Sequence, residues 1–307
     1  MSSKKLRKIN IGQLGTLSID IPVLSIGAGP KRVVFLCGIH GDERSGLFVV
    51  NKLLPSLKSL NGVVDIVIAA NPLAQALNQR VSPNDLADVN RMFPGNLEAD
   101  FTQIMAHKIL EFCKGADAVI DLHTFEDTAP IVAIFMNSGS ADVRSKSLKL
   151  IEVFNPQAVW QLDFTSLEES KLLGALGPIL ANEGIPNFAV EMPQSFSISE
   201  QEIGMVKNGL LRVLHSLGVI NEKPAEVKHG FSIFKRKNTR VKTAGLFIPH
   251  KTVFTEVKAG DVIGELVSLP MFKGEPVCAP CEGTLLIIKQ RNLVSTGDVV
   301  FSIGVKV

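Results

Sequence analysis

The chain of 307 residues carries 32 Lys and Arg against 30 Asp and Glu, a formal charge of +2 at pH 7. This near balance of positive and negative charge argues against a nucleic-acid-binding surface. We therefore expect no nucleic-acid partner. No apolar run approaches the roughly 18 residues that cross a bilayer, and the first residues lack the apolar core of a secretory leader. We therefore expect no membrane partner and a cytoplasmic location.

The cysteines and the absent tyrosine limit the available chemistry. Four cysteines are too few and too scattered for a disulfide framework in a chain of this length. Cys278 and Cys281 form a Cys-x-x-Cys pair, but no second pair or nearby histidine completes a zinc site, which favours a simple hairpin. Tyrosine is absent, which removes one familiar phenolic donor.

Short apolar runs alternate with helical patterns from residue 32 to 218, which is typical of an α/β domain with a largely parallel sheet. We expect strands at 32–37, 62–69, 117–122, 131–136 and 186–191, and helices at 45–56, 98–114, 142–153, 170–182 and 199–217. The last helix has the strongest signal, because Ser199 and Glu202 form a capping box and Gly218 ends the apolar repeat.

The pattern changes after the charged segment 221–228, where turn glycines and short β-rich runs replace helical periodicity. The segment Val257–Val262 recurs as Val294–Val299, and both copies contain Gly-Asp. Such a repeat predicts a small all-β sandwich similar to biotinyl and lipoyl carrier domains. Lys273 is a remote candidate for carrier-type modification, but its neighbours do not match and a surface lysine is favoured. We predict two domains, 1–220 and 221–307.

A candidate metal site begins where the apolar run 33–37 ends. His40 and Glu43 lie three residues apart directly after it, and a turn there would bring an imidazole and a carboxylate together. His123 is the best third ligand, because it ends the apolar run 118–122 in the same way. Two histidines and one glutamate leave a coordination position open for water, as in catalytic rather than structural zinc sites.

Further residues suit a reaction beside such a metal. Glu191 ends the apolar run 188–190 and is a candidate general base, although a glutamate hydrogen-bonded to backbone is the alternative. Arg80 and Arg91 lie in turn-rich sequence between the ligand segments, and Asn90 adds a donor beside Arg91. Loop arginines are often merely solvated, yet their planar guanidinium groups can bind carboxylates and oxyanions through two hydrogen bonds.

Several segments together resemble the succinylglutamate desuccinylase and aspartoacylase family, whose members are relatives of the zinc carboxypeptidases. The matching segments, in family order, are 38–43, 71–74, Arg80, 88–95, 121–124 and 190–191. The resemblance implies an α/β domain of zinc carboxypeptidase type with a mostly parallel mixed sheet, followed by a small all-β, barrel-sandwich-like domain. It implies one Zn²⁺ per chain on His40, Glu43 and His123, Arg80 polarising the scissile carbonyl, Asn90 and Arg91 holding a substrate carboxylate, and Glu191 as base.

The expected function is a cytoplasmic zinc hydrolase that uses an activated water to cleave the amide of an N-acyl amino acid or a similar small carboxylate-bearing amide. The alternatives are a metallocarboxypeptidase acting on peptides and a non-catalytic protein that binds metal or ligand. A homo-oligomer is left open. Relatives can place a tyrosine over the substrate, which this chain cannot do, and neither Arg144 nor Lys171 lies in a motif that would recognise an acidic group.

Overall fold

The computed structural model describes residues 3–125, 127–225 and 230–307. Its strands are β1 (Lys4–Leu14), β2 (Leu17–Gly27), β3 (Lys31–Cys37), β4 (Gly62–Val67), β5 (Ala118–Thr124), β6 (Val132–Met136), β7 (Ala158–Leu162), β8 (Asn187–Met192), β9 (Ile233–Arg240), β10 (Gly245–Pro249), β11 (Glu256–Val257), β12 (Val262–Ser268), β13 (Lys273–Cys278), β14 (Gly283–Ile288), β15 (Asn292–Val294) and β16 (Val299–Lys306). Its helices are α1 (Ser45–Leu53), η1 (Leu54–Ser56), α2 (Pro72–Leu77), η2 (Val89–Arg91), α3 (Phe101–Cys113), α4 (Ala141–Phe154), α5 (Leu167–Ser170), α6 (Leu176–Asn182) and α7 (Glu200–Ser216). None of the described helices is long and apolar enough to span a membrane.

A 12-stranded mixed sheet runs through the molecule in the order β1-β2-β4-β3-β5-β8-β6-β7-β9-β16-β14-β11. Its central strands β4, β3, β5 and β8 are parallel neighbours, and their apolar sequences are buried on both faces. All five predicted strands are present in this sheet. Strands β1, β2 and β7 are not among the predicted ones; β1 is a largely exposed edge strand with little apolar alternation to signal it.

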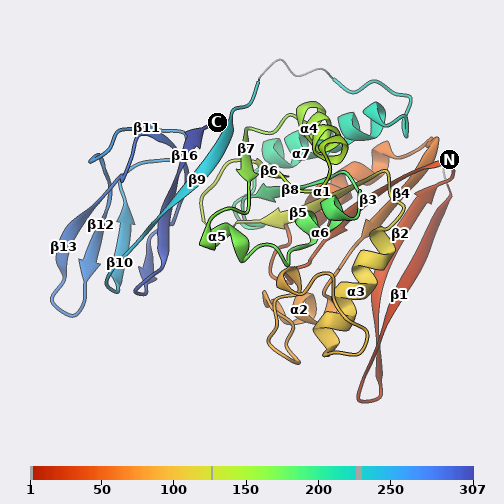
Figure 1. The fold of residues 1–307 in the computed structure, drawn as a ribbon, viewed down its shortest axis with the longest axis horizontal. Coiled ribbons are helices and arrows are strands. Elements are labelled where there is room, and N and C mark those ends of the chain that lie inside the picture. Colours follow the sequence, from red (N-terminus) through yellow and green to blue (C-terminus); the bar gives the residue numbers. More distant parts are fainter. Residues whose placement is uncertain (1–2, 126, 226–229) are drawn as a thin grey trace.

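Helices cover both faces of the central sheet. Helices α1, α4 and α7 pack together on one face, whereas α3 and α6 pack on the other. Figure 1 shows α4 and α7 above the sheet and α3 below it. The mixed α/β architecture is therefore confirmed, and the carboxyl ends of β3, β5 and β8 meet at one edge, where such sheets place ligands.

Helix α7 follows its sequence signals closely. The Ser199 side chain accepts a hydrogen bond from the Glu202 backbone N–H, and the Glu202 carboxylate reaches back to the Ser199 backbone. Gly218, with φ +73°, follows the last turn and donates to His215. These local contacts satisfy groups that a helix end leaves unpaired, which is why the helix was predictable within a residue or two.

The predicted helix at 170–182 is wrong, because the chain forms α5, a turn and then α6. Pro178 stands in the first turn of α6, where a missing N–H costs nothing; inside a longer helix it would break the hydrogen-bond ladder. The intervening turn packs tightly, since a Cβ on Gly174 would lie 2.4 Å from the Arg91 carbonyl oxygen. The backbone oxygen of Gly174 also accepts a bond from Phe93.

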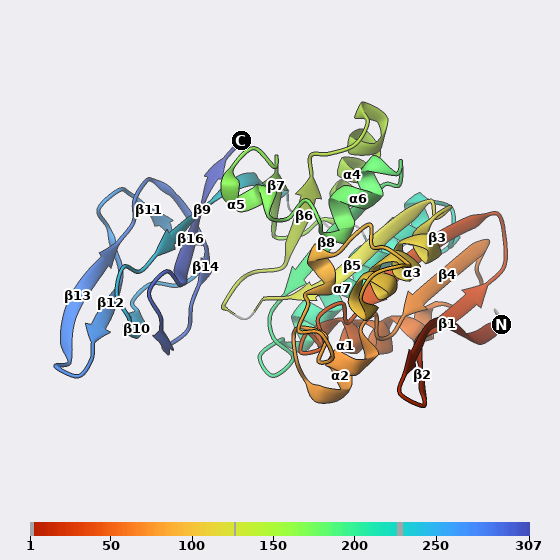
Figure 2. The ribbon, with the colours of Figure 1, turned by 60° about the horizontal axis from the view of Figure 1, so that its bottom comes forward.

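The C-terminal part is an all-β sandwich that continues the large sheet. Strands β9, β16, β14 and β11 extend the sheet's edge, and a separate antiparallel sheet in the order β13-β12-β10-β15 packs on them. Figures 1 and 2 show this part beside the α/β part, joined through β9. The repeated Gly-Asp segments form the same turn twice, because Asp261 accepts from Lys258 N–H and Asp298 from Ser295 N–H.

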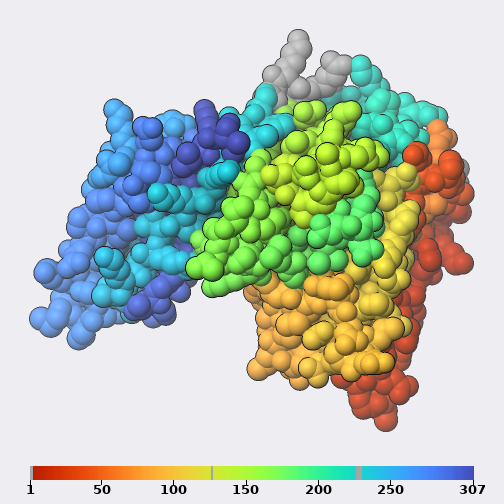
Figure 3. Space-filling model, viewed as in Figure 1, coloured from red at the N-terminus to blue at the C-terminus, as the bar shows by residue number. Residues whose placement is uncertain are grey.

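Other predicted features of this part lie on or near its surface. Lys273 begins β13, at an exposed hairpin. Cys278 is exposed and Cys281 half-buried, and both are free thiols. The same part also contacts the α/β part: Figure 3 shows β9 against the segment that contains α5, where Arg240 pairs with Glu168.

Candidate active site

The turn between β3 and α1 places His40 and Glu43 in the interior. Both side chains are buried, at 3% and 6% exposure. Gly38 opens the turn with φ +71°, and Glu43 N–H closes it on the His40 carbonyl. Gly41 packs directly on the backbone of α2, because a Cβ there would lie 2.0 Å from the Ala74 carbonyl carbon. Glycine at this position therefore lets the turn seat against the 71–74 segment.

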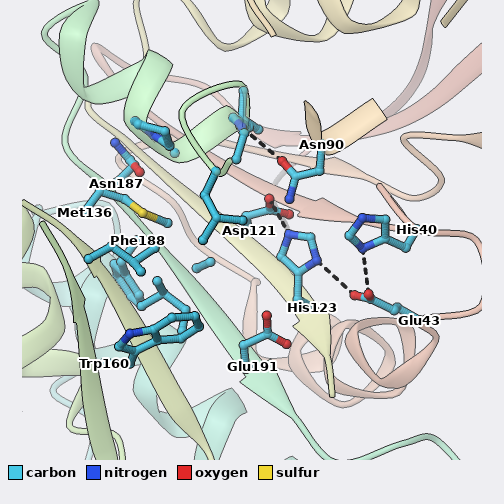
Figure 4. Close-up of a pocket in the computed structure, with 18 of the residues that line it drawn as sticks. His40, Glu43, Asn90, Asp121, His123, Met136, Trp160, Asn187, Phe188 and Glu191 are labelled. Atoms are coloured by element: carbon cyan, nitrogen blue, oxygen red, sulfur yellow. Dashed lines mark hydrogen bonds and ion pairs between the residues drawn. The ribbon is translucent and has the colours of Figure 1, made fainter. Parts of the chain in front are cut away.

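His123 completes a cluster with these two residues. The carboxylate of Glu43 lies between the two imidazoles: its Oε1 is 2.6 Å from His40 Nδ1 and its Oε2 is 2.9 Å from His123 Nδ1. One ligand atom from each residue lies within 4.8 Å of the others, so the group can hold a metal ion. Figure 4 shows His40 and His123 converging on Glu43. The fold thus brings together the three predicted ligands, His40, Glu43 and His123.

Each histidine also has a carboxylate behind it. Asp121 Oδ2 is 2.7 Å from His123 Nε2, and Asp88 Oδ1 is 3.1 Å from His40 Nε2. Such carboxylates orient an imidazole and raise its basicity as a metal ligand. Sequence reasoning gave neither aspartate a role. The available signal was the Asp-x-His spacing on β5, which places both side chains on one face of the strand.

The cluster is electrostatically coupled. Burial alone would raise the pKa of Glu43, but His123 and His40 hold it far below its usual range. Burial alone would lower the pKa of both histidines, yet the carboxylates of Asp88, Asp121 and Glu43 raise it, most strongly for His123. The interaction with His40 lowers the pKa of Asp88 to about 2 against the effect of burial. Without a metal, the carboxylates therefore favour the imidazolium forms more than water does.

Glu191 lies next to the cluster on β8. The pairing of β5 with β8 puts it directly opposite His123. Its Oε2 is buried and has no hydrogen-bond partner within the described ranges. Burial raises the pKa of Glu191 to about 7, with a further contribution from Glu43, while His123 opposes the rise. A carboxyl that titrates near neutrality in a cavity has the properties of a general acid or base.

The two predicted arginines and Asn90 line the same cavity but make different contacts. Arg80 donates to Glu43 Oε1 at 3.0 Å and approaches Asp88 at 3.6 Å. Arg91 donates to the Asn90 carbonyl at 2.7 Å, and burial lowers its pKa although Asp88 opposes this. The Asn90 side-chain oxygen accepts from Leu176 N–H at the start of α6. Asn90 therefore also braces the cavity wall.

The cavity measures about 430 Å³ and extends from the His-Glu-His cluster to an apolar region. In Figure 4, His40 and Glu43 lie on one side and Met136 and Trp160 on the other, with Glu191 between them. Arg236, from β9 of the C-terminal part, also lines the cavity. Sequence reasoning missed it, because nothing in the local sequence of β9 marks a residue that becomes part of a distant site.

The two basic residues without a motif are not part of this cavity. Arg144 donates to the Gly139 carbonyl beside α4, and Lys171 lies in the turn after α5. The aromatic lining residues Phe125, Trp160 and Phe188 carry no hydroxyl, so a phenolic contact has no counterpart among them.

Known proteins support the architecture. The model of the succinylglutamate desuccinylase/aspartoacylase catalytic domain matches residues 29–217. The N-alpha-acetyl-L-2,4-diaminobutyric acid deacetylase of Halomonas elongata is 27% identical over 197 residues, which span 62% of this chain and 57% of that protein. The chain thus matches somewhat more than half the length of this relative.

Solved structures share the whole fold. A succinylglutamate desuccinylase/aspartoacylase from Rhodobacter sphaeroides superposes with a TM-score of 0.86 at 21% identity, covering 100% of this chain and 95% of that one. The product-bound ectoine utilization protein EutE of Ruegeria pomeroyi has a TM-score of 0.86 at 22% identity, covering 99% and 95%. The chain belongs to the succinylglutamate desuccinylase/aspartoacylase family. Members of this family are deacylases that hydrolyse amides.

Proposed function

We propose that this chain is a zinc-dependent amidohydrolase that releases the acyl group of an N-acyl amino acid or a similar small amide bearing a carboxylate. The observation that carries the proposal is the convergence of three ligand-type side chains with an unpaired carboxyl in one cavity. In this proposal His40, Glu43 and His123 hold the metal, within a hydrolytic domain of residues 1–220.

The donor set fits zinc better than a hard cation. Two imidazoles and one carboxylate suit Zn²⁺, whereas Ca²⁺ and Mg²⁺ prefer oxygen ligands. Asp121 and Asp88 accept from the outer ring nitrogens, which leaves the Nδ1 atoms of His123 and His40 turned toward Glu43. Three protein ligands also leave a coordination position open, which a catalytic site requires.

A zinc ion bound there would acidify a water molecule and polarise a carbonyl group. The protein's own contribution is to move protons and to stabilise charge. Glu191 accepts the proton of the attacking water and then delivers it to the leaving nitrogen, for which a pKa near 7 is well suited. Arg80 donates to the developing oxyanion, since its guanidinium already reaches Glu43 in the cluster.

Substrate orientation is assigned to Arg91 and Asn90. Both line the cavity, and a guanidinium beside an amide suits a carboxylate better than any neutral group. The deacetylase relative from Halomonas elongata acts, by its name, on an N-acetylated amino acid, which supports this substrate class. The C-terminal residues 221–307 remain predicted as a separate domain, and a cytoplasmic location stays a prediction.

The test is a panel of N-acyl amino acids assayed with zinc-loaded protein, with chelator-treated protein as control. Zinc-dependent release of the amine is expected. Short peptides with free C-termini compete in the same assay, and preferential cleavage of these would identify a carboxypeptidase. Tight zinc binding without turnover of any substrate would favour the non-catalytic alternative.

A further inference from the structure

The C-terminal part contributes a cation to the cavity. Arg236 lies on β9, which pairs in parallel with β7 so that Phe234 stands opposite Trp160. The guanidinium carbon of Arg236 lies over the Trp160 ring, 3.6 Å from its centre, in a cation–π contact. Both residues line the cavity that contains the His-Glu-His cluster. This contact holds the guanidinium over the ring and leaves its N–H groups available as hydrogen-bond donors.

The side chain of Arg236 has no polar partner among the described residues. Across residues 3–125, 127–225 and 230–307 its guanidinium forms no hydrogen bond or ion pair, and its Nε is buried without an acceptor. The neighbouring carboxylate of Glu168 is already engaged, because Asn238 donates to it at 2.6 Å and Arg240 pairs with it. A buried donor without an acceptor destabilises the fold, and more so when it is charged.

The pKa of Arg236 is consistent with a guanidinium that has no acceptor beside it. Burial lowers the pKa of Arg236 to about 10, and the carboxylates of Glu168 and Glu191 offset only part of the effect. The side chain therefore still carries its charge at neutral pH. Positive charge that is only partly compensated at a cavity wall attracts an anionic group from the ligand.

The arginine beside the His-Glu-His cluster differs from Arg236 in its charge compensation. Arg80 is already paired with Glu43 and Asp88, so its charge is largely compensated. Met136 and Leu172 belong to the apolar wall of the same cavity. A ligand that reaches from the cluster to Arg236 would thus pass Glu191 and apolar lining residues before meeting this further cation.

We propose that Arg236 is a specificity-determining residue that binds a carboxylate at the end of the substrate remote from the scissile amide. The proposal rests on the proposed amidohydrolase function. It makes the C-terminal part a component of the active site, because β9 supplies the residue that selects the substrate. The guanidinium of Arg236 would bind the carboxylate through two hydrogen bonds, while its contact with the Trp160 ring holds it in position.

Binding tests the proposal without turnover. Malonate, succinate, glutarate and adipate are titrated calorimetrically into the protein, with butyrate as the match for succinate that lacks one carboxylate. We expect one dicarboxylate to bind roughly tenfold or more tightly than butyrate, and Arg236→Gln to remove that advantage. Lys237→Gln is the matched control, since Lys237 is the next residue on β9 and is exposed. An unchanged preference in Arg236→Gln would overturn the proposal.

Matched substrates then locate the carboxylate. N-succinyl and N-butyryl derivatives of one amino acid differ at the acyl end, whereas N-acetylglutamate and N-acetylglutamine differ at the amine end. The unmodified protein should prefer the charged member of one pair by roughly tenfold or more in kcat/KM, and Arg236→Gln should abolish that preference. Arg236→Lys, which keeps the charge but loses the fork, should retain part of it.

The outcomes separate the two proposals. Equal losses for the charged and neutral members of both pairs, with a lowered Tm, would make Arg236 a structural residue and refute its selective role. Dicarboxylate binding that depends on Arg236 without hydrolysis of any amide would instead refute the amidohydrolase function and leave the anion site standing.

Discussion

His123 and Glu191 stand directly opposite one another on the parallel strands β5 and β8. Neighbouring residues in register project to the same face of a sheet, so the candidate metal ligand and the candidate base share one wall of the cavity. Two buried strands hold them in place, and such strands position reacting groups more rigidly than loops do. The predictions below test this arrangement.

Glu191→Gln should separate chemistry from metal binding. The substitution preserves the shape of the side chain but cannot accept a proton, so turnover should fall by about two to four orders of magnitude. Zinc content, measured by elemental analysis, should not change, because Glu191 is not among the three clustered ligands. Activity close to that of the unmodified protein would mean that another group accepts the proton.

The same substitution should stabilise the metal-free protein at high pH. The folded-state pKa of Glu191 is raised to about 7 from 4.5, so folding favours the neutral acid. Its contribution is fully present below pH 4.5 and is lost as the pH rises through 7, up to about 3 kcal/mol. Urea unfolding in chelator should show Glu191→Gln gaining stability over the unmodified protein at pH 8 and little at pH 4.5. A pH-independent difference would contradict the buried-acid interpretation.

Metal content should depend on His123 and, less steeply, on Asp121. His123→Ala removes a ligand and should leave little bound zinc, whereas Asp121→Asn keeps the ligand but weakens its support, which typically costs about 10–100-fold in affinity. His250→Ala is the control, since His250 is exposed in the C-terminal part. Zinc titrations against a competing chelator measure all three, and a normal affinity in His123→Ala would exclude it as a ligand.

Zinc binding should release protons and strengthen with rising pH. The pKa values of His40 and His123 are raised in the metal-free structure, but a metal requires neutral imidazoles. Affinity should therefore increase about tenfold per pH unit for each displaced proton until the histidines are neutral. Calorimetry in buffers with different ionisation enthalpies counts these protons. A pH-independent affinity between pH 6 and 8 would show that the imidazoles are already neutral.

Arg91 should act on the substrate's carboxylate rather than on the reaction step. A methyl ester of the preferred N-acyl amino acid should have a much higher KM than the acid. Arg91→Ala should raise KM for the acid and barely change it for the ester, because only the acid loses a charged partner. Steady-state kinetics of both enzymes on both substrates isolate this pairwise term. Equal hydrolysis of ester and acid by the unmodified protein would leave Arg91 a structural role only.

Local sequence was sufficient wherever neighbouring residues determine the conformation. The capping box of Ser199 and Glu202 predicted the start of α7, and the apolar runs predicted the five buried strands. The turn after β3 is also marked by local sequence, which predicts that His40 and Glu43 come together. The helix predicted at 170–182 failed for two reasons: Pro178, a local signal, begins a new helix, and the preceding turn packs against Arg91, a contact that no local pattern reports.

Long-range pairing accounts for the rest of the site. Asp88 supports His40 across 48 residues of sequence, and Arg236 meets Trp160 only because β9 pairs with β7. Strand pairing between distant segments depends on the packing of the whole chain and leaves little trace in the sequence of either strand. The His-Glu-His cluster and Glu191 could thus be found from sequence, whereas the carboxylates behind the histidines and the cation from the C-terminal part emerged from the assembled sheet.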